Sequence, residues 1–124
     1  MVTGEIKEMN IEKMIKWHER MFPQATYKSQ IKHLIQELKE VLEAQTVAEA
    51  AEEFADVAIV LISLKRFEES KYFADEMLKS FDSYIQKLDK FIERKMIKIA
   101  YRVGQGAYFW NGEDYDRVRT SLLS

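Results

Sequence analysis

Apolar residues recur at every third or fourth position along most of the chain, which is the spacing of amphipathic helices. The first such segment runs from Glu5 to Met21, and its apolar positions are Ile6, Met9, Met14, Trp17 and Met21. Pro23 follows closely, and because the residue before a proline disfavours the α conformation, we expect this helix to end there. The second segment runs from Tyr27 to Ala44. Its single apolar stripe is made of Ile31, Leu34, Ile35, Leu38, Val41 and Leu42.

A third helix is predicted from Thr46 to Arg66, and apolar residues cover most of its circumference. At its start, Thr46 and Glu49 have the spacing of a capping box, in which each side chain accepts a hydrogen bond from a free backbone N–H. A helix that is apolar on most sides is normally enclosed by other helices. We therefore expect this helix to be surrounded by the others.

A fourth helix is predicted from Ser70 to Val103, after a loop at Glu68–Lys71. A break is needed there because one helix over residues 47–103 would be far longer than globular helices usually are. The stretch GQGAYFWNG that follows Val103 is predicted to be an aromatic, glycine-containing loop. A short last helix fits the residues from Asp114 to Leu122.

Composition narrows the class of protein. A length of 124 residues fits a single domain over 1–124. The absence of cysteine excludes a disulfide framework, a thiol nucleophile and a cysteine-ligated metal site. The longest apolar stretch, Phe54 to Leu64, is interrupted by Asp56 and Ser63 and is too short to span a membrane. The first ten residues contain no apolar signal core, so we expect a cytoplasmic protein without a membrane partner.

The formal net charge of −2 conceals two segments of opposite sign. Residues 37–56 hold seven acids and one base, whereas residues 84–103 hold six bases and two acids. The near-neutral total gives no reason to expect a nucleic-acid partner. The split instead suggests one acidic end for a metal and one basic end for phosphate.

Two pairs of carboxylates have the i, i+3 spacing of one helix face, Glu37 with Glu40 and Glu53 with Asp56. A short loop joins the two helices, so they should pack antiparallel, and the pairs can then converge on one point. Asp56 lies in an apolar part of its helix, where an ionised carboxylate is costly unless it meets water or a cation. Four hard oxygen ligands suit Mg²⁺ or Mn²⁺. The alternative is that these acids form a solvated helix face.

Lys95 and Arg102 project near the centre of the apolar face of the predicted fourth helix, and Lys98 flanks that face. Cations on an inward face need an acidic or phosphate partner. The alternative is that this end of the helix overruns the core, so that these side chains reach water. Candidates for contacting a base, each of which can also serve as packing, are Trp17, His33, Tyr101, Tyr108 and Trp110.

The order Glu37-x-x-Glu40, twelve residues, Glu53-x-x-Asp56 resembles the signature of the MazG-like all-α nucleotide pyrophosphohydrolases, which is EExxE followed at a distance by ExxD. The surrounding residues are similar to the dATP/dGTP diphosphohydrolase-like branch at Trp17, Phe22, Pro23, Thr26, Ser29, His33, Leu34 and Val57. Lys95 and Arg102 match the Lys and Arg of the pattern K-x-x-x-N-x-x-R-x-W that such proteins often carry. The chain departs from these patterns at Gln36, Ile99 and Gly104.

The resemblance implies an all-α, four-helix-type bundle that assembles as a homodimer or homotetramer. It also implies Mg²⁺-dependent hydrolysis of a nucleoside triphosphate between its α and β phosphates, which yields a monophosphate and pyrophosphate. The metal, with Mn²⁺ as a substitute, would be held by Glu37, Glu40, Glu53 and Asp56, and Glu37 or Glu40 would accept a proton from the attacking water. The substrate would be bound by Lys95, Lys98, Arg102, His33 and Trp17. The other hypotheses are a helical nucleotide-binding protein without catalysis and a purely structural oligomeric bundle.

Overall fold

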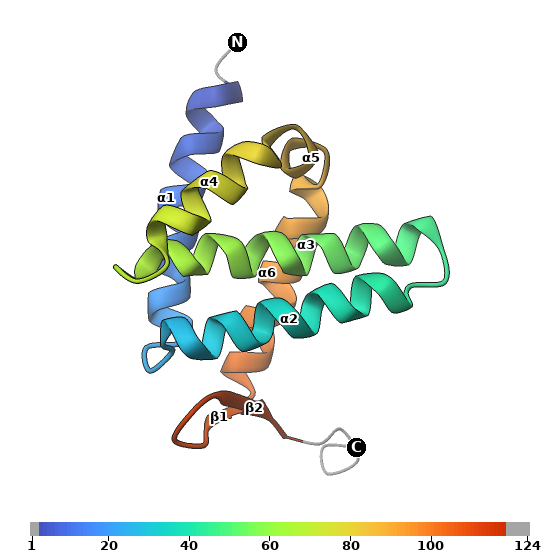
Figure 1. The fold of residues 1–124 in the computed structure, drawn as a ribbon. Coiled ribbons are helices and arrows are strands. Elements are labelled where there is room, and N and C mark those ends of the chain that lie inside the picture. The colour runs from blue at the N-terminus through green and yellow to red at the C-terminus, as the bar shows by residue number, and fades with distance from the viewer. Residues whose placement is uncertain (1–2, 119–124) are drawn as a thin grey trace.

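The computed structural model describes residues 3–118, of which residues 3–10 are described by their backbone alone, and it is mostly helical (Figure 1). The elements are α1 (Thr3–Met21), α2 (Tyr27–Glu43), α3 (Val47–Ser63), the 3₁₀ helix η1 (Leu64–Arg66), α4 (Lys71–Ser80), α5 (Asp82–Lys87), α6 (Asp89–Gly104), β1 (Tyr108–Trp110) and β2 (Tyr115–Arg117). The predicted all-α class is confirmed. None of the helices in the described part of the chain is long and apolar enough to cross a membrane.

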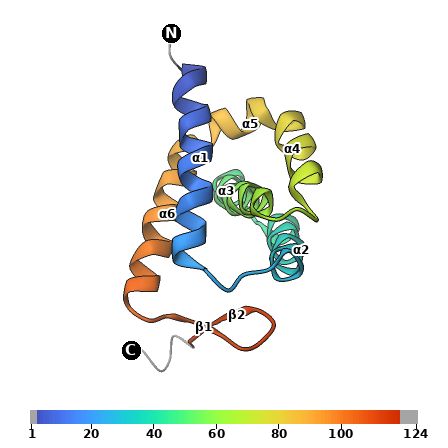
Figure 2. The same ribbon diagram turned by 90° about the vertical axis from the view of Figure 1, so that its left-hand side faces the viewer.

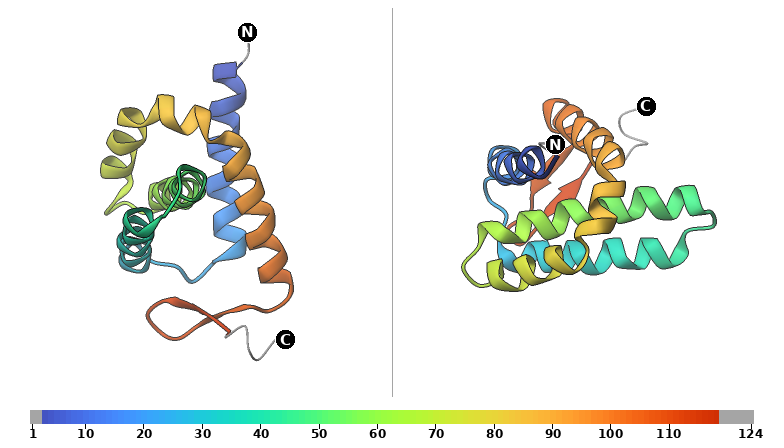
Figure 3. Two further views of the ribbon diagram at one scale, coloured as in Figure 1. Left: turned by 90° about the vertical axis from the view of Figure 1, so that its right-hand side faces the viewer. Right: turned by 90° about the horizontal axis from the view of Figure 1, so that it is seen from above.

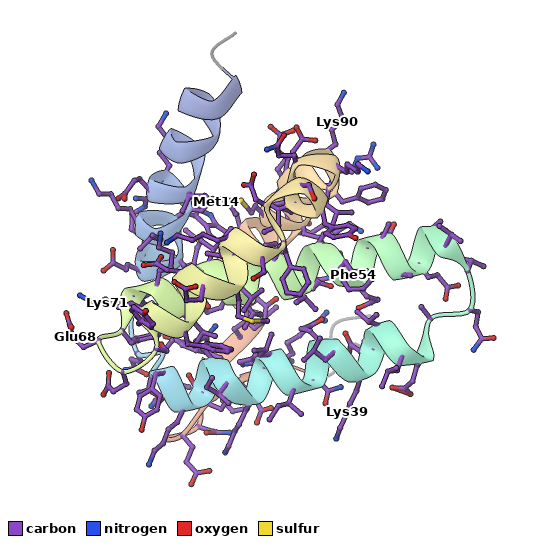
Figure 4. The ribbon with its side chains drawn as sticks, turned by 45° about the horizontal axis from the view of Figure 1, so that its top comes forward. Met14, Lys39, Phe54, Glu68, Lys71 and Lys90 are labelled. Atoms are coloured by element: carbon purple, nitrogen blue, oxygen red, sulfur yellow. The ribbon has the colours of Figure 1, made fainter. Side chains whose placement is uncertain are left out.

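Helix α3 lies at the centre of the molecule (Figure 2). It packs against α1, α2, α4 and α6, and its second half is buried from Val57 to Ser63. Met14 of α1, labelled in Figure 4, is buried in the same core, together with Leu34 of α2 and Ile92 of α6. The enclosure predicted from the apolar circumference of this helix is therefore confirmed for its second half, whereas Val47 and Phe54 in its first half are exposed.

Helices α2 and α3 form an antiparallel hairpin, as predicted (Figure 1). Of the capping box predicted at α3, one half is present, because Thr46 Oγ1 accepts from the N–H of Glu49 at 3.0 Å. The Glu49 carboxylate accepts from the N–H of Gln45 instead, at 2.9 Å. A complete capping box begins α2, where Thr26 and Ser29 bond reciprocally. Side chains thus fix where both helices begin.

The fourth predicted helix is wrong as a single element, because α4, α5 and α6 replace it. The chain bends at Phe81 and at Leu88, so α4 and α5 arch over α3 and α6 descends beside α1 (Figure 3). Backbone hydrogen bonds continue across the first bend, from Phe81 N–H to Met77 O and from Ile85 N–H to Phe81 O. The bend therefore needs no glycine or proline. The predicted loop at Glu68–Lys71 is confirmed up to Ser70, since Lys71 is the first residue of α4.

The predicted helix from Asp114 to Leu122 is wrong over its described part, where β2 pairs antiparallel with β1, and residues 119–122 lie outside the described residues. The turn between the strands begins at Asn111, whose side-chain oxygen accepts from the N–H groups of Glu113 and Asp114. Gly112 follows with a φ of 103°, which favours glycine. The sequence after Asn111 thus returns as a strand, and the hairpin lies beyond the end of α6 (Figure 1).

Candidate metal centre

The four predicted carboxylates meet between α2 and α3. Glu37 and Glu40 lie on α2, and Glu53 and Asp56 lie on the facing side of α3. One oxygen from each of the four side chains lies within 4.8 Å of the others. The antiparallel packing therefore brings the two i, i+3 pairs together as the sequence predicts.

The cluster carries more negative charge than its surroundings compensate. Glu37 Oε2 and Glu53 Oε2 are buried without a hydrogen-bond partner. Burial, followed by the hydrogen bond with Glu40 and the charges of the other acids, raises the pKa of Glu37 to about 9. Burial and the hydrogen bond with Glu40 raise the pKa of Glu53 to about 7. Burial also opposes ionisation of Glu40, but its hydrogen bonds with Glu37 and Glu53 outweigh this effect and lower its pKa.

Lys95 of α6 supplies a positive charge to the cluster. Its Nζ lies 3.2 Å from Asp56 Oδ2, and both side chains are mostly buried. Burial raises the pKa of Asp56, although the charge and hydrogen bond of Lys95 act in the opposite direction. A single lysine cannot balance four carboxylates, so the cluster favours protons or a divalent cation.

These residues fit a hard divalent cation. Carboxylate oxygens are the ligands that Mg²⁺ and Mn²⁺ prefer. The two oxygens without donors in Glu37 and Glu53 are free to become ligands, and they are buried at the point where the two pairs meet. A solvated helix face would leave such oxygens in water, so the burial argues against that alternative.

A pocket of about 360 Å³ extends from the carboxylates to the C-terminal strands. Its remaining lining residues are His18, Phe22, Gln30, His33, Ile59, Val60, Lys95, Ile99, Arg102, Tyr108, Tyr115 and Arg117. Lys95 and Arg102 thus share one cavity with the acids.

Several predicted substrate residues do not reach this pocket. His33 lines it, but Lys98 is exposed on another side of α6, and Trp17 packs partly buried against the core. Of the aromatic candidates, Tyr108 lines the pocket, whereas Tyr101 is 68% exposed and Trp110 packs against Tyr115.

A buried polar group on the pocket wall was not predicted from the sequence. Arg66 donates from Nη1 to His18 Nδ1 at 2.8 Å, and Gln30 donates from Nε2 to Ser63 Oγ at 2.8 Å. Burial, then the charges of Arg66 and His33, lowers the pKa of His18 to about 3, so this ring is neutral at neutral pH. A signal was available, because His18 is four residues from Met14 and shares its inward face.

The basic residue Arg117 was missed for a different reason. It follows a turn and lines the pocket from β2, in a segment whose pattern fits a short helix. No local signal links this segment to α2 or α6.

Comparisons of the chain with family models, curated proteins and solved structures found no match.

Proposed function

We propose that this protein is a Mg²⁺-dependent nucleoside triphosphate pyrophosphohydrolase. The observation that carries the proposal is the pair of buried, unpartnered oxygens of Glu37 and Glu53, within a four-carboxylate cluster that opens onto a pocket. Lys95 and Arg102 line the same pocket and supply positive charge for phosphate groups. The resemblance of the four-acid signature to the MazG-like enzymes also supports this reaction.

The proposed cation is Mg²⁺, which Mn²⁺ can replace, held by Glu37, Glu40, Glu53 and Asp56. When bound, it neutralises phosphate charge and makes a water molecule more acidic. Glu37 or Glu40 accepts the proton of the attacking water. The new bond forms between the water oxygen and the α phosphorus, while the bond from that phosphorus to the bridging oxygen breaks. The products are a nucleoside monophosphate and pyrophosphate.

The residues of α6 have a separate role in this mechanism. Lys95 and Arg102 are seven residues apart, about two helical turns, and so lie on one face. Their N–H groups donate to phosphate oxygens and stabilise the charge that develops as pyrophosphate leaves. The pairing of Lys95 with Asp56 also holds this lysine beside the carboxylates before substrate binds.

Pyrophosphate release from a panel of ribo- and deoxynucleoside triphosphates, with and without Mg²⁺, tests the proposal. We expect turnover of at least one triphosphate that depends on the metal. Glu53→Gln should lower this turnover more than about 100-fold, because it removes a ligand whose charge the cation requires. Glu52→Gln is the matched control, since Glu52 is the exposed neighbour of Glu53 on α3. If no triphosphate is hydrolysed, the proposed enzymatic function is refuted.

A second candidate function is nucleotide binding without hydrolysis. It is favoured by Ile99, which lines the pocket at the position where the resembled pattern has asparagine. An isoleucine there cannot donate a hydrogen bond to the substrate. Calorimetric binding of a nucleoside triphosphate with Mg²⁺, without release of pyrophosphate, would favour this candidate.

We also propose that the chain self-associates, through an apolar groove of about 530 Å³ between α3 and the α4–α5 arch. Among its described lining residues only Lys87 is charged. Phe54, labelled in Figure 4, is 46% exposed there. At the tip of the α2–α3 hairpin, Leu42 and Val47 are 86% and 89% exposed. In a twofold dimer, these protruding apolar side chains would cover the apolar groove of the other copy.

A further inference from the structure

The C-terminal hairpin presents one of its faces to the pocket. Tyr108 and Arg117 are directly opposite each other in the register, and both line the pocket, as does Tyr115. Phe109 pairs with Asp116 on the opposite face of the hairpin, and Phe109 is 49% exposed. The alternation along each strand therefore divides the hairpin into a pocket face and a solvent face.

The hairpin is held in place by contacts from two other parts of the chain. His33 Nε2 on α2 lies 2.8 Å from Asp114 Oδ1 at the start of the returning strand. The Tyr115 hydroxyl accepts a hydrogen bond from the backbone N–H of Gln24, between α1 and α2, at 3.0 Å. The ring of Phe22 makes T-shaped contacts with the rings of Tyr108 and Tyr115, with centroid distances of 5.2 and 5.0 Å. These contacts fix the position of the aromatic wall at the hairpin end of the pocket.

The pocket has chemically different ends. Along α2 its lining runs from Glu40 at the carboxylates to Gln30, ten residues or about 15 Å of helix away. Along α6 it runs from Lys95, beside Asp56, to Arg102, whose carbonyl accepts from the N–H of Ala107 just before β1. One end is therefore acidic, the hairpin end is aromatic, and cations lie along the path between them.

We propose that the hairpin end is a base-binding subsite, in which Tyr108 stacks on the nucleobase and the hairpin determines specificity for nucleotides over other polyphosphates. This inference rests on the proposed function, because it assumes that the triphosphate lies along Lys95 and Arg102 towards the carboxylates. Every base has a π face, so an aromatic wall binds planar bases broadly. Arg117, opposite Tyr108, adds a planar cation beside the stack.

Equilibrium binding of two kinds of ligand, measured by calorimetry in Mg²⁺, tests this inference. The first kind is the α,β-methylene analogues of adenosine, guanosine, cytidine and uridine triphosphates, which are not cleaved at the α–β position. The second is inorganic tripolyphosphate, which has the phosphates but no base. Tyr108→Leu removes the aromatic face but keeps apolar volume against Phe22. Phe109→Leu is the matched control on the solvent face of the same strand.

We expect the wild-type protein to bind at least one nucleotide analogue more tightly than tripolyphosphate. Tyr108→Leu should weaken binding of that nucleotide about 5- to 160-fold, the range of a single base–aromatic stack, and leave binding of tripolyphosphate within about twofold. Phe109→Leu should change neither. Equal weakening of both ligands by Tyr108→Leu, or equal binding of both by the wild type, overturns the base subsite while the proposed function stands. Binding of neither ligand by the wild type refutes the proposed function, and the subsite with it.

Discussion

The carboxyl groups of Glu37 and Glu53 each have a buried oxygen without a hydrogen-bond donor. Such an oxygen is costly to bury, by about 1–3 kcal/mol for a neutral group and more for a charged one. A proton relieves this cost by neutralising the carboxylate, whereas a divalent cation relieves it by coordinating the ionised oxygen. Because a metal ligand must be deprotonated, the proposed binding of Mg²⁺ at this cluster would displace protons, which would link the two equilibria.

This linkage predicts opposite effects of pH on the metal-free and metal-bound protein. The pKa of Glu37 is raised from 4.5 to about 9, so its contribution to the stability of the metal-free protein is full below 4.5 and is lost as pH rises to about 9. Mg²⁺ binds the ionised form and should restore that stability. We expect the rise in Tm on adding saturating Mg²⁺, measured by scanning calorimetry, to be larger at about pH 8.5 than at about pH 6. A rise that is equal or smaller at the higher pH would contradict the linkage.

At the scale of elements, only some of the cations on α6 line the pocket. Lys95 and Arg102 line the pocket together with Ile99, which lies between them on the same helix face. Lys98 is on the same helix but exposed. A basic helix segment alone therefore does not identify which cations line the pocket, because only one face of the helix meets α3.

Substitution of Arg102 and of Lys98 tests whether the two faces of α6 contribute differently to activity. Arg102→Met should lower kcat/KM for the hydrolysed triphosphate about 10- to 100-fold, since a charge-assisted donor in a half-buried pocket is lost. It should leave the rise in Tm with Mg²⁺ intact, because Arg102 is not among the four carboxylate residues. Lys98→Met, the matched control, should leave kcat/KM within about twofold. Equal losses in both variants would show that the charge of the helix acts as a whole.

At the scale of the whole molecule, the groove and the pocket lie on different faces of α3. Glu53 and Asp56 line the pocket that holds the carboxylate cluster, whereas Phe54 and Leu61 line the apolar groove. Self-association through the groove would therefore cover apolar surface without closing the pocket. Helix α3 lines both surfaces, because apolar residues cover its groove side and the acids occupy a narrow sector on its pocket side.

The proposed self-association predicts that light scattering after size exclusion gives twice the 14.7 kDa of one chain, or a higher multiple. Tyr84→Glu should shift the protein to the mass of one chain, because it places a charge in the apolar groove. Tyr84 is 62% exposed in the single chain, so the substitution should leave the fold intact. Tyr101→Glu is the matched control, since Tyr101 is 68% exposed on α6 outside the groove. A wild type that is monomeric at all concentrations would contradict the proposal.

The sequence predicted the features that depend on local patterns. The apolar stripes of α1 and α2, the proline after α1 and Thr46 at the start of α3 each act over a few residues, so they can be recognised without knowing the fold. The convergence of Glu37, Glu40, Glu53 and Asp56 also followed, because a short loop leaves two helices little choice but to pack antiparallel. The spacing within each helix and the short loop between them were therefore enough to predict that the carboxylates converge.

The bends at Phe81 and Leu88 and the hairpin that completes the pocket could not be read in this way. Helical hydrogen bonds continue across the first bend, so no residue type marks it. The hairpin strands are three residues each, too short for a clear alternation of polar and apolar positions. Their position depends on contacts with residues such as His33, more than 80 residues earlier in the chain.

The sequence by itself determined that this is a helical protein with two carboxylate pairs on neighbouring helices, because helix periodicity and i, i+3 spacing are properties of adjacent residues. Only the tertiary structure decided that Lys95 pairs with Asp56, that two carboxylate oxygens are buried without donors, and that an aromatic hairpin forms the far end of the pocket. These features arise where α3, α6 and the hairpin come together. Burial and electrostatic coupling depend on such distant contacts, which no local pattern specifies.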